Sequence, residues 1–344
     1  MPSPTPESPS RGATGFLYAL ATACVWGTIP IALKLVLGPL DGATVVWYRF
    51  AFAAVFLTAL LGPRGQLKLP ELTRGEIVLL VVTVLTFSAN NLTFMLGLKY
   101  ISPTASQVLI QLAPLLVIGA GVFVFGEPFG GLQWIGTPVL AGGILLFFHT
   151  QLAELASGVS TSGMGILLIS IAALCWAAFA VGQKRLLPRF GSFRLMWMVY
   201  AVGVVLMSPL AAPAHAARLT GWQSLLLFYS CLTTVLGYAM FSEALKLWEA
   251  SRVGAVVAVT PLFTWTFNEV AAGLFPQFVH AEAADGWSLV GALCVAGGSA
   301  LAALGRKTTG VISARPFPGP PALSAPVEEH QPVAAARNQC PTRS

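Results

Sequence analysis

Long apolar segments, each close to the length of a membrane-spanning helix, recur along the chain between Phe16 and Leu304. Because a helix rises about 1.5 Å per residue, about 20 apolar residues cross the roughly 30 Å hydrocarbon core of a bilayer. Ten segments meet or approach this length: Phe16–Gly38, Thr44–Leu61, Ile77–Leu98, Thr104–Phe125, Leu132–Phe148, Met164–Leu187, Leu195–Ala212, Gln223–Leu245, Val253–Phe275 and Trp287–Leu304. The pattern predicts an all-α integral membrane protein with ten transmembrane helices.

Composition agrees with the membrane assignment. Of the 344 residues, 56% are hydrophobic and 9% are charged, whereas about a quarter of the residues of a soluble domain are charged. The net charge of +6 comes without a basic run interleaved with aromatics, so no nucleic acid partner is expected. Cysteines and histidines show no metal-ligand spacing, and the chain has no GxxxxGK[ST] phosphate loop. No metal, cofactor or ATP use is expected.

Positive charges predict the orientation of the spans. With the N-terminus inside, the inner flanks of the ten segments hold twelve Lys and Arg residues, and the outer flanks hold Lys34, Lys99 and Arg218. The positive-inside rule therefore predicts that both termini are cytoplasmic and that the loops containing Asp41 and Ser157 face outward. Residues 1–14 and the proline-rich tail 306–344 are expected to be disordered.

The second half of the chain repeats the first. An offset of 150 residues pairs Trp26 with Trp176 and Trp47 with Trp197, and later an offset of 147 pairs Pro114-Leu115 with Pro261-Leu262. Each copy, residues 15–150 and 163–305, holds five predicted spans. Because five is odd, the second copy enters the membrane in the opposite orientation. Inverted repeats of this kind are common in secondary transporters, whose binding site lies near the midplane between the repeats.

Several short motifs resemble those of one transporter family. They are Ala23-Cys24-Val25-Trp26-Gly27, Tyr48-Arg49-Phe50, Gly97-Leu98-Lys99-Tyr100, Ala113-Pro114-Leu115 and Gly126-Glu127-Pro128. With them, residues from about Gly15 to Gly305 resemble the drug/metabolite transporter superfamily, specifically proteins with two EamA-type domains. The second copy departs from the pattern, because Ala177 follows Trp176 and Leu274-Phe275-Pro276 stands where a Gly-Glu is expected. The resemblance implies a multi-pass transporter of the bacterial inner membrane, often an exporter of amino acids or related metabolites, that works by alternating access.

Polar side chains inside the spans are the candidates for a substrate site. Polar groups in hydrocarbon are costly unless they find partners, so they usually face the bundle interior or a water-filled cavity. The candidate substrate-binding residues are Asn90, Asn91, Gln111, Tyr238, Thr264 and Asn268. Interhelical hydrogen bonding is the structural alternative, and it is favoured for single threonines.

Aromatic and proline residues have two interpretations each. Trp26 and Trp176 are expected either to stack on a substrate ring or cation or to serve helix packing. Pro114 and Pro261 each remove a backbone donor near mid-span, which favours a hinge or a kinked helix interface.

Charged residues within the spans are few. Arg49 lies roughly 8 Å from the outer start of its span, close enough to snorkel to the interface. Glu269 lies deeper than most interfacial carboxylates. It is the candidate for proton coupling, with an outer-interface anchor as the alternative.

Together these features favour a secondary transporter, most simply an exporter, of small uncharged or zwitterionic metabolites. A nucleotide-sugar or sugar-phosphate carrier of the same superfamily is the main alternative, although an anionic cargo favours several cavity cations and the spans offer mainly Arg49. An enzyme needs a reactive constellation that the spans lack, and a scaffold without transport remains a further alternative. The expected partners are a small-molecule substrate and the lipid bilayer; the substrate's identity, the coupling ion and the oligomeric state stay open.

Overall fold

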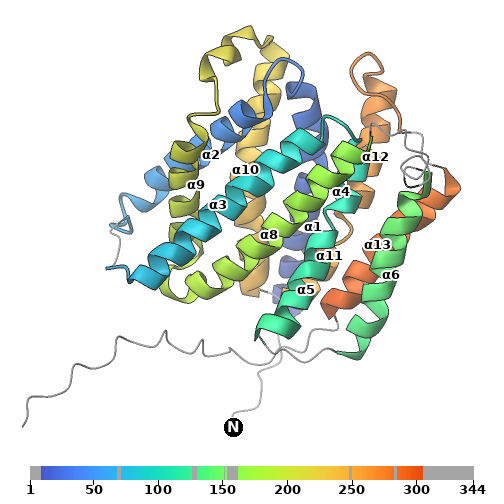
Figure 1. Cartoon of the computed structure of the whole chain (residues 1–344), viewed down its shortest axis with the longest axis horizontal. Helices are drawn as coiled ribbons and strands as arrows, with labels where there is room; N and C mark the ends of the chain where they lie inside the picture. Colours follow the sequence, from blue (N-terminus) through green and yellow to red (C-terminus); the bar gives the residue numbers. More distant parts are fainter. Residues whose placement is uncertain are drawn as a thin grey trace, which may run out of the picture. The chain divides into compact units, whose positions relative to one another are not determined.

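The computed structural model describes residues 9–67, 71–125, 130–150, 152, 162–247, 250–282 and 285–304. Every regular element in these ranges is a helix, which confirms the all-α class (Figure 1). The elements are α1 Pro9–Val36, α2 Gly42–Leu61, α3 Arg74–Gly97, α4 Pro103–Leu109, α5 Leu112–Phe125, α6 Gly131–Phe147, α8 Ser162–Phe190, α9 Ser192–Met207, the 3-10 helix η1 Pro213–Arg218, α10 Gly221–Leu247, α11 Ala250–Val257, α12 Thr260–Leu274 and α13 Gly286–Leu304.

Each of the ten predicted segments is helical over most of its length. Seven helices are long and apolar enough to cross a membrane, and three shorter apolar helices occupy the remaining predicted segments, at Pro103–Val117, Gly131–Phe147 and Ser192–Met207. Because α1 begins at Pro9, residues 9–14 of the segment predicted to be disordered are helical. A proline is tolerated in a first helical turn, where a backbone N–H has no intrahelical acceptor. The Gly126-Glu127-Pro128 motif, Ser157 and the tail 306–344 lie outside the described residues.

Short polar side chains define where several helices start. Asp41 accepts the backbone N–H of Thr44 at 2.8 Å and so caps α2. In α3, Thr73 and Glu76 form a reciprocal capping box. Asp285 accepts the N–H of Ser288 at 2.8 Å at the start of α13, and this hydrogen bonding holds the pKa of the Asp285 carboxyl below its ordinary value.

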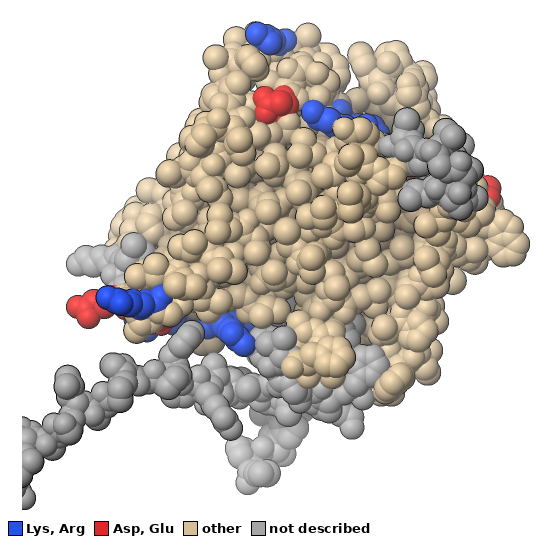
Figure 2. Space-filling model, in the orientation of Figure 1, with Lys and Arg blue, Asp and Glu red and all other residues tan. Residues whose placement is uncertain are grey.

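The outer surface of the helical body is apolar. Large hydrophobic side chains such as Val55, Phe123, Leu225 and Val205 are more than half exposed. On the face drawn in Figure 2, charged residues lie towards the two ends of the helices and leave a broad uncharged zone between them. Such a zone is expected where a protein faces the hydrocarbon layer of a bilayer.

Helices from the two halves of the chain pack in pairs. Figure 1 shows α2 with α9 at one side of the bundle and α6 with α13 at the other. Backbones approach closely where glycines meet: a Cβ added to Gly298 would lie 2.3 Å from the backbone nitrogen of Leu140, and one added to Gly136 would lie 2.4 Å from that of Ala302. Small residues commonly serve such contacts in membranes, where helices gain little from hydrophobic association. The largest buried cluster, around Phe50, fills the α2, α3, α8 and α9 side.

Two of the predicted spans are interrupted, and they are the two in which Pro114 and Pro261 were expected to favour a hinge or a kink. Helix α4 ends at Leu109 and α5 begins at Leu112, and the counterpart α11 ends at Val257 before α12 begins at Thr260. Both breaks lie just before a proline, Pro114 or Pro261, which cannot donate to the carbonyl four residues earlier. The neighbouring N–H groups form tighter bonds instead, as from Ala113 to the Ile110 carbonyl at 2.9 Å.

Candidate functional site

The two helix breaks meet each other. The side-chain amide of Gln111, in the first break, donates a hydrogen bond of 3.1 Å to the carbonyl oxygen of Ala258, in the second. In a continuous helix that carbonyl would accept the N–H of Leu262, but this N–H donates to Val259 at 3.0 Å. By the repeat offset of 147 residues, Gln111 and Ala258 hold the same position in the two copies. The breaks therefore form a shared centre between the two halves.

Helix α1 packs against both breaks. Gln107, in α4, donates to the Trp26 carbonyl at 3.2 Å. On the other side, a Cβ added to Gly27 would lie 2.9 Å from the Cβ of Phe263 in α12. The glycine thus permits α1 to approach the second break closely. A bulky residue there would force the break and α1 apart.

The predicted aromatic residues come together beside α1. The Trp26 ring lies 5.7 Å from the ring of Tyr238 in an edge-on arrangement and 5.5 Å from that of Phe241. Trp176 lies close to the side chain of Tyr238. Trp26, Trp176 and Tyr238 therefore form an aromatic cluster contributed by α1, α8 and α10. Both the stacking and the packing interpretations of the tryptophans are compatible with this cluster.

Arg49 is buried, not extended to the membrane interface. Its side chain reaches inward from α2, and 9% of the residue is exposed. Its Nε donates to the Thr234 hydroxyl at 3.0 Å, and Nη1 lies 3.4 Å from the Asn91 amide oxygen. Arg49 was not among the predicted site residues. The available signal was a charge inside a predicted span, which is rare and usually functional.

The other predicted polar residues divide by their hydrogen bonds. Asn90 donates to the Ala172 carbonyl of α8 at 2.8 Å, which is the interhelical bonding named as the alternative. Thr264 is fully buried, and its hydroxyl donates within its own helix to Thr260 at 3.1 Å. By contrast, Asn91 faces Arg49, and Gln111 spans the breaks. Of these predicted substrate-binding residues, Asn91 and Gln111 therefore lie at the centre between the two halves, whereas Asn90 and Thr264 make contacts within or between helices.

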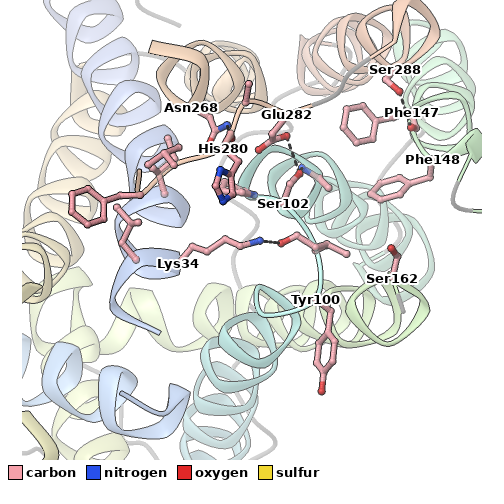
Figure 3. Close-up of a pocket in the computed structure, with 18 residues that line it drawn as sticks. Lys34, Tyr100, Ser102, Phe147, Phe148, Ser162, Asn268, His280, Glu282 and Ser288 are labelled. Atoms are coloured by element: carbon pink, nitrogen blue, oxygen red, sulfur yellow. Dashed lines mark hydrogen bonds between the residues drawn. The ribbon is translucent and has the colours of Figure 1, made fainter. Parts of the chain in front are cut away.

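A cavity of about 440 Å³ opens at the end of the bundle where α1 ends and α4 begins (Figure 3). Its lining includes Lys34, Asn268, His280 and Glu282, together with aromatic residues such as Phe147. Lys34 donates to the Ile101 carbonyl at 2.6 Å. Asn268 lies on this cavity, away from the breaks, and donates to the His280 carbonyl at 3.2 Å.

Glu282 ties the segment after α12 to α4. Its carboxylate accepts the Ser102 hydroxyl at 2.8 Å and the Thr104 N–H at 3.1 Å, as Figure 3 shows for Ser102. The backbone N–H of Glu282 donates to Glu269 at 2.9 Å. Glu269 is thus held at the edge of the same end of the bundle, partly exposed. Its role in proton coupling stays a prediction.

Residues 13–149 and 163–304 each match the model of the EamA-like transporter family. An inner membrane transporter of Escherichia coli K12, YhbE, named as uncharacterized, is 34% identical over 302 residues, which cover 87% of this chain and 94% of the relative. An uncharacterized transporter of Haemophilus influenzae is 36% identical over 295 residues, 85% of this chain and 95% of its own.

More distant comparisons agree with these two. A probable amino-acid metabolite efflux pump of Salmonella typhimurium is 24% identical over 303 residues, which cover 83% of this chain and 92% of the relative. The crystal structure of another protein superposes with a TM-score of 0.58 at 15% identity, covering 86% of this chain and 99% of the other. That likeness concerns the fold alone.

Proposed function

The chain belongs to the EamA-like transporter family, and we propose that it is a secondary transporter of the bacterial inner membrane, an exporter of small uncharged or zwitterionic metabolites such as amino acids. The location is supported by the inner membrane name of the Escherichia coli relative and by the seven helices of membrane-spanning length. The cargo class is supported by the name of the Salmonella relative, at 24% identity.

The proposed architecture is two inverted five-helix repeats, residues 15–150 and 163–305, with both termini in the cytoplasm. Reciprocal helix packing supports it: α3 packs on α8 as its counterpart α10 packs on α1, and α5 packs on α8 as α12 packs on α1. The pairs α2 with α9 and α6 with α13 join equivalent helices. Such reciprocity is expected when the halves are related by a twofold axis. The twelve-to-three charge bias supports the orientation.

The contact between Gln111 and Ala258 carries the proposal. Broken helices at the interface between inverted repeats expose backbone groups near the membrane midplane, where secondary transporters bind substrate. We place the substrate site around Gln111, Asn91 and the aromatic cluster of Trp26, Trp176 and Tyr238. Asn90 and Thr264 then support the helices, and Asn268 lies on the route to the outer end. Substrate would replace Gln111 as the partner of the Ala258 carbonyl when the halves separate.

Alternating access requires the two halves to rock about this site. Pro114 and Pro261 lie next to the breaks and supply bending points without loss of further backbone hydrogen bonds. The cavity near Lys34 is then the outward vestibule, and the Glu282 contacts with Ser102 and Thr104 close part of it.

Transport into and out of proteoliposomes tests the proposal. Purified protein should exchange one or more members of a panel of labelled amino acids and related metabolites, and the panel is measured with and without a pH gradient. Empty liposomes and liposomes with Gln111→Leu are the controls. Failure of the wild type to move any member of the panel would refute the proposed function.

A further inference from the structure

Arg49 is a buried cation whose described partners are all neutral. The hydroxyl of Thr234 accepts from Nε at 3.0 Å, and the amide oxygen of Asn91 lies 3.4 Å from Nη1. Among the described residues, Arg189 pairs with Glu76, the His149 ring contacts Asp285, and no carboxylate pairs with Arg49. A buried charge is costly when it is unpaired. The guanidinium therefore lacks the anion that usually accompanies it.

The groups around Arg49 are polar but uncharged, and not all of them have hydrogen-bond partners. The thiol of Cys231 and the phenol groups of Tyr200 and Tyr238 lie in the neighbourhood of the guanidinium. The Tyr200 hydroxyl is buried and has no hydrogen-bond partner among the described residues. The Thr234 hydroxyl already donates to the Ser230 carbonyl at 2.7 Å. The remaining guanidinium N–H groups and the Tyr200 O–H have no acceptor among the described residues, and the oxygens of an anion would supply one.

We propose that Arg49 binds the carboxylate of the transported substrate, with the Tyr200 hydroxyl and Asn91 beside it. The inference rests on the proposed transport function and narrows its cargo to compounds that carry a carboxylate. A guanidinium presents parallel N–H groups that match the two oxygens of a carboxylate, which a Lys ammonium cannot reproduce.

The surroundings of Arg49 also fit the rest of a zwitterion. Tyr238 connects the guanidinium to the aromatic cluster, since its ring lies 5.7 Å from that of Trp26. The faces of such rings attract an ammonium group and also pack against apolar side chains. A zwitterion therefore binds with its carboxylate at Arg49 and its ammonium or side chain against the rings. Because Arg49 is 9% exposed, the substrate reaches it when the halves have separated.

Ligand-dependent thermal unfolding of the full-length protein in detergent tests the assignment. The probes are the common L-amino acids, the matched amino-acid amides, which lack the negative charge, and inorganic phosphate. A ligand that binds the folded state raises the unfolding temperature. One or more amino acids should stabilise the wild type, and their amides should not. In Arg49→Gln the affinity for the same amino acids should fall by about 30-fold or more, as for removal of one partner of a buried charge pair.

Three further variants separate recognition from folding. Asn91→Asp keeps Arg49 and places a carboxylate against it, so amino-acid binding should be lost although the arginine remains. Arg49→Lys keeps the charge without the paired geometry and should bind weakly. Arg64→Gln removes an exposed arginine just after the end of α2, where its side chain donates to the Leu60 carbonyl, and this variant should bind as the wild type does. If Arg49→Gln does not fold, Asn91→Asp and Arg49→Lys still decide the outcome.

Several results would overturn the assignment. They are equal stabilisation by amino acids and their amides, full binding in Arg49→Gln or Asn91→Asp, stabilisation by phosphate in place of carboxylates, and no stabilisation by any amino acid. If any of these results were found and the protein still transported an uncharged compound, the carboxylate site would be wrong but the proposed transport function would stand. Conversely, Arg49-dependent binding without transport in proteoliposomes would contradict the transport function and keep the carboxylate site.

Discussion

Gln111 donates a hydrogen bond to the carbonyl of Ala258, the residue that occupies its own position in the second copy of the repeat, at 3.1 Å. The bond joins two helix breaks, and it links α4–α5 of one half to α11–α12 of the other. Because a single side chain spans the breaks, a small separation of the halves would release it. This contact is therefore the structural basis of the proposed alternating access.

Close packing of α6 and α13 predicts a sharp difference between adjacent glycines. Gly298→Ala should lower stability by about 1–3 kcal/mol, because the new Cβ would lie 2.3 Å from the Leu140 nitrogen. Gly297→Ala is the matched control, since an added Cβ at that position meets no atom within 4 Å. Thermal unfolding in detergent measures both. Equal stability of the two variants would show that α6 and α13 do not pack as described.

The prolines predict an effect on the rate of transport. Pro114→Ala and Pro261→Ala each restore a backbone N–H and allow the broken spans to become continuous. We expect both proteins to fold with equal or higher stability and to exchange substrate several-fold more slowly. Pro138→Ala, in the uninterrupted helix α6, is the control. Unchanged exchange in both break variants would show that the prolines serve packing alone.

Glu269 is the predicted site of proton coupling. In Glu269→Gln, uptake or efflux driven by a pH gradient should be lost, while substrate exchange at equal pH continues, because exchange needs no net proton movement. Glu71→Gln, at an exposed position before α3, is the control. Retention of gradient-driven transport by Glu269→Gln would remove this residue from any coupling mechanism.

Charge bias predicts the topology. Reporter fusions in the loop containing Asp41 and at Ser157, which lies outside the described residues, should report an outward location. A fusion at the C-terminus should report the cytoplasm. An external C-terminus would contradict the arrangement of ten spans.

Helix positions could be predicted from the sequence because each apolar run matches or approaches the thickness of a bilayer, and this length depends on local composition alone. The breaks in the fourth and ninth spans were harder to predict, since a continuous helix and a broken one can have the same run of apolar residues. Pro114 and Pro261 were the local signal, but the tighter hydrogen bonds before them depend on the packed neighbours.

Side-chain direction limited the prediction of the site. Asn90 and Asn91 are adjacent and equally deep, yet one helical step turns Asn90 towards Ala172 and Asn91 towards Arg49. Only the positions of α8 and α2 distinguish these roles. Arg49 was misjudged because its distance from the helix end indicates a depth but not the direction in which its side chain points. In the structure that direction is inward, towards α3 and α10.

Substrate exchange by proteoliposomes with wild-type protein, Gln111→Leu and Gln111→Asn is the most direct test of the central claim that substrate binds where the two breaks meet. The wild type should exchange substrate, whereas Gln111→Leu should lose exchange although it folds, since one hydrogen bond contributes only about 0.5–1.5 kcal/mol to stability. Gln111→Asn, which keeps a shorter amide, should exchange weakly or change the order of preferred substrates. Exchange by a folded Gln111→Leu at the wild-type rate and with the same preferences would contradict the account.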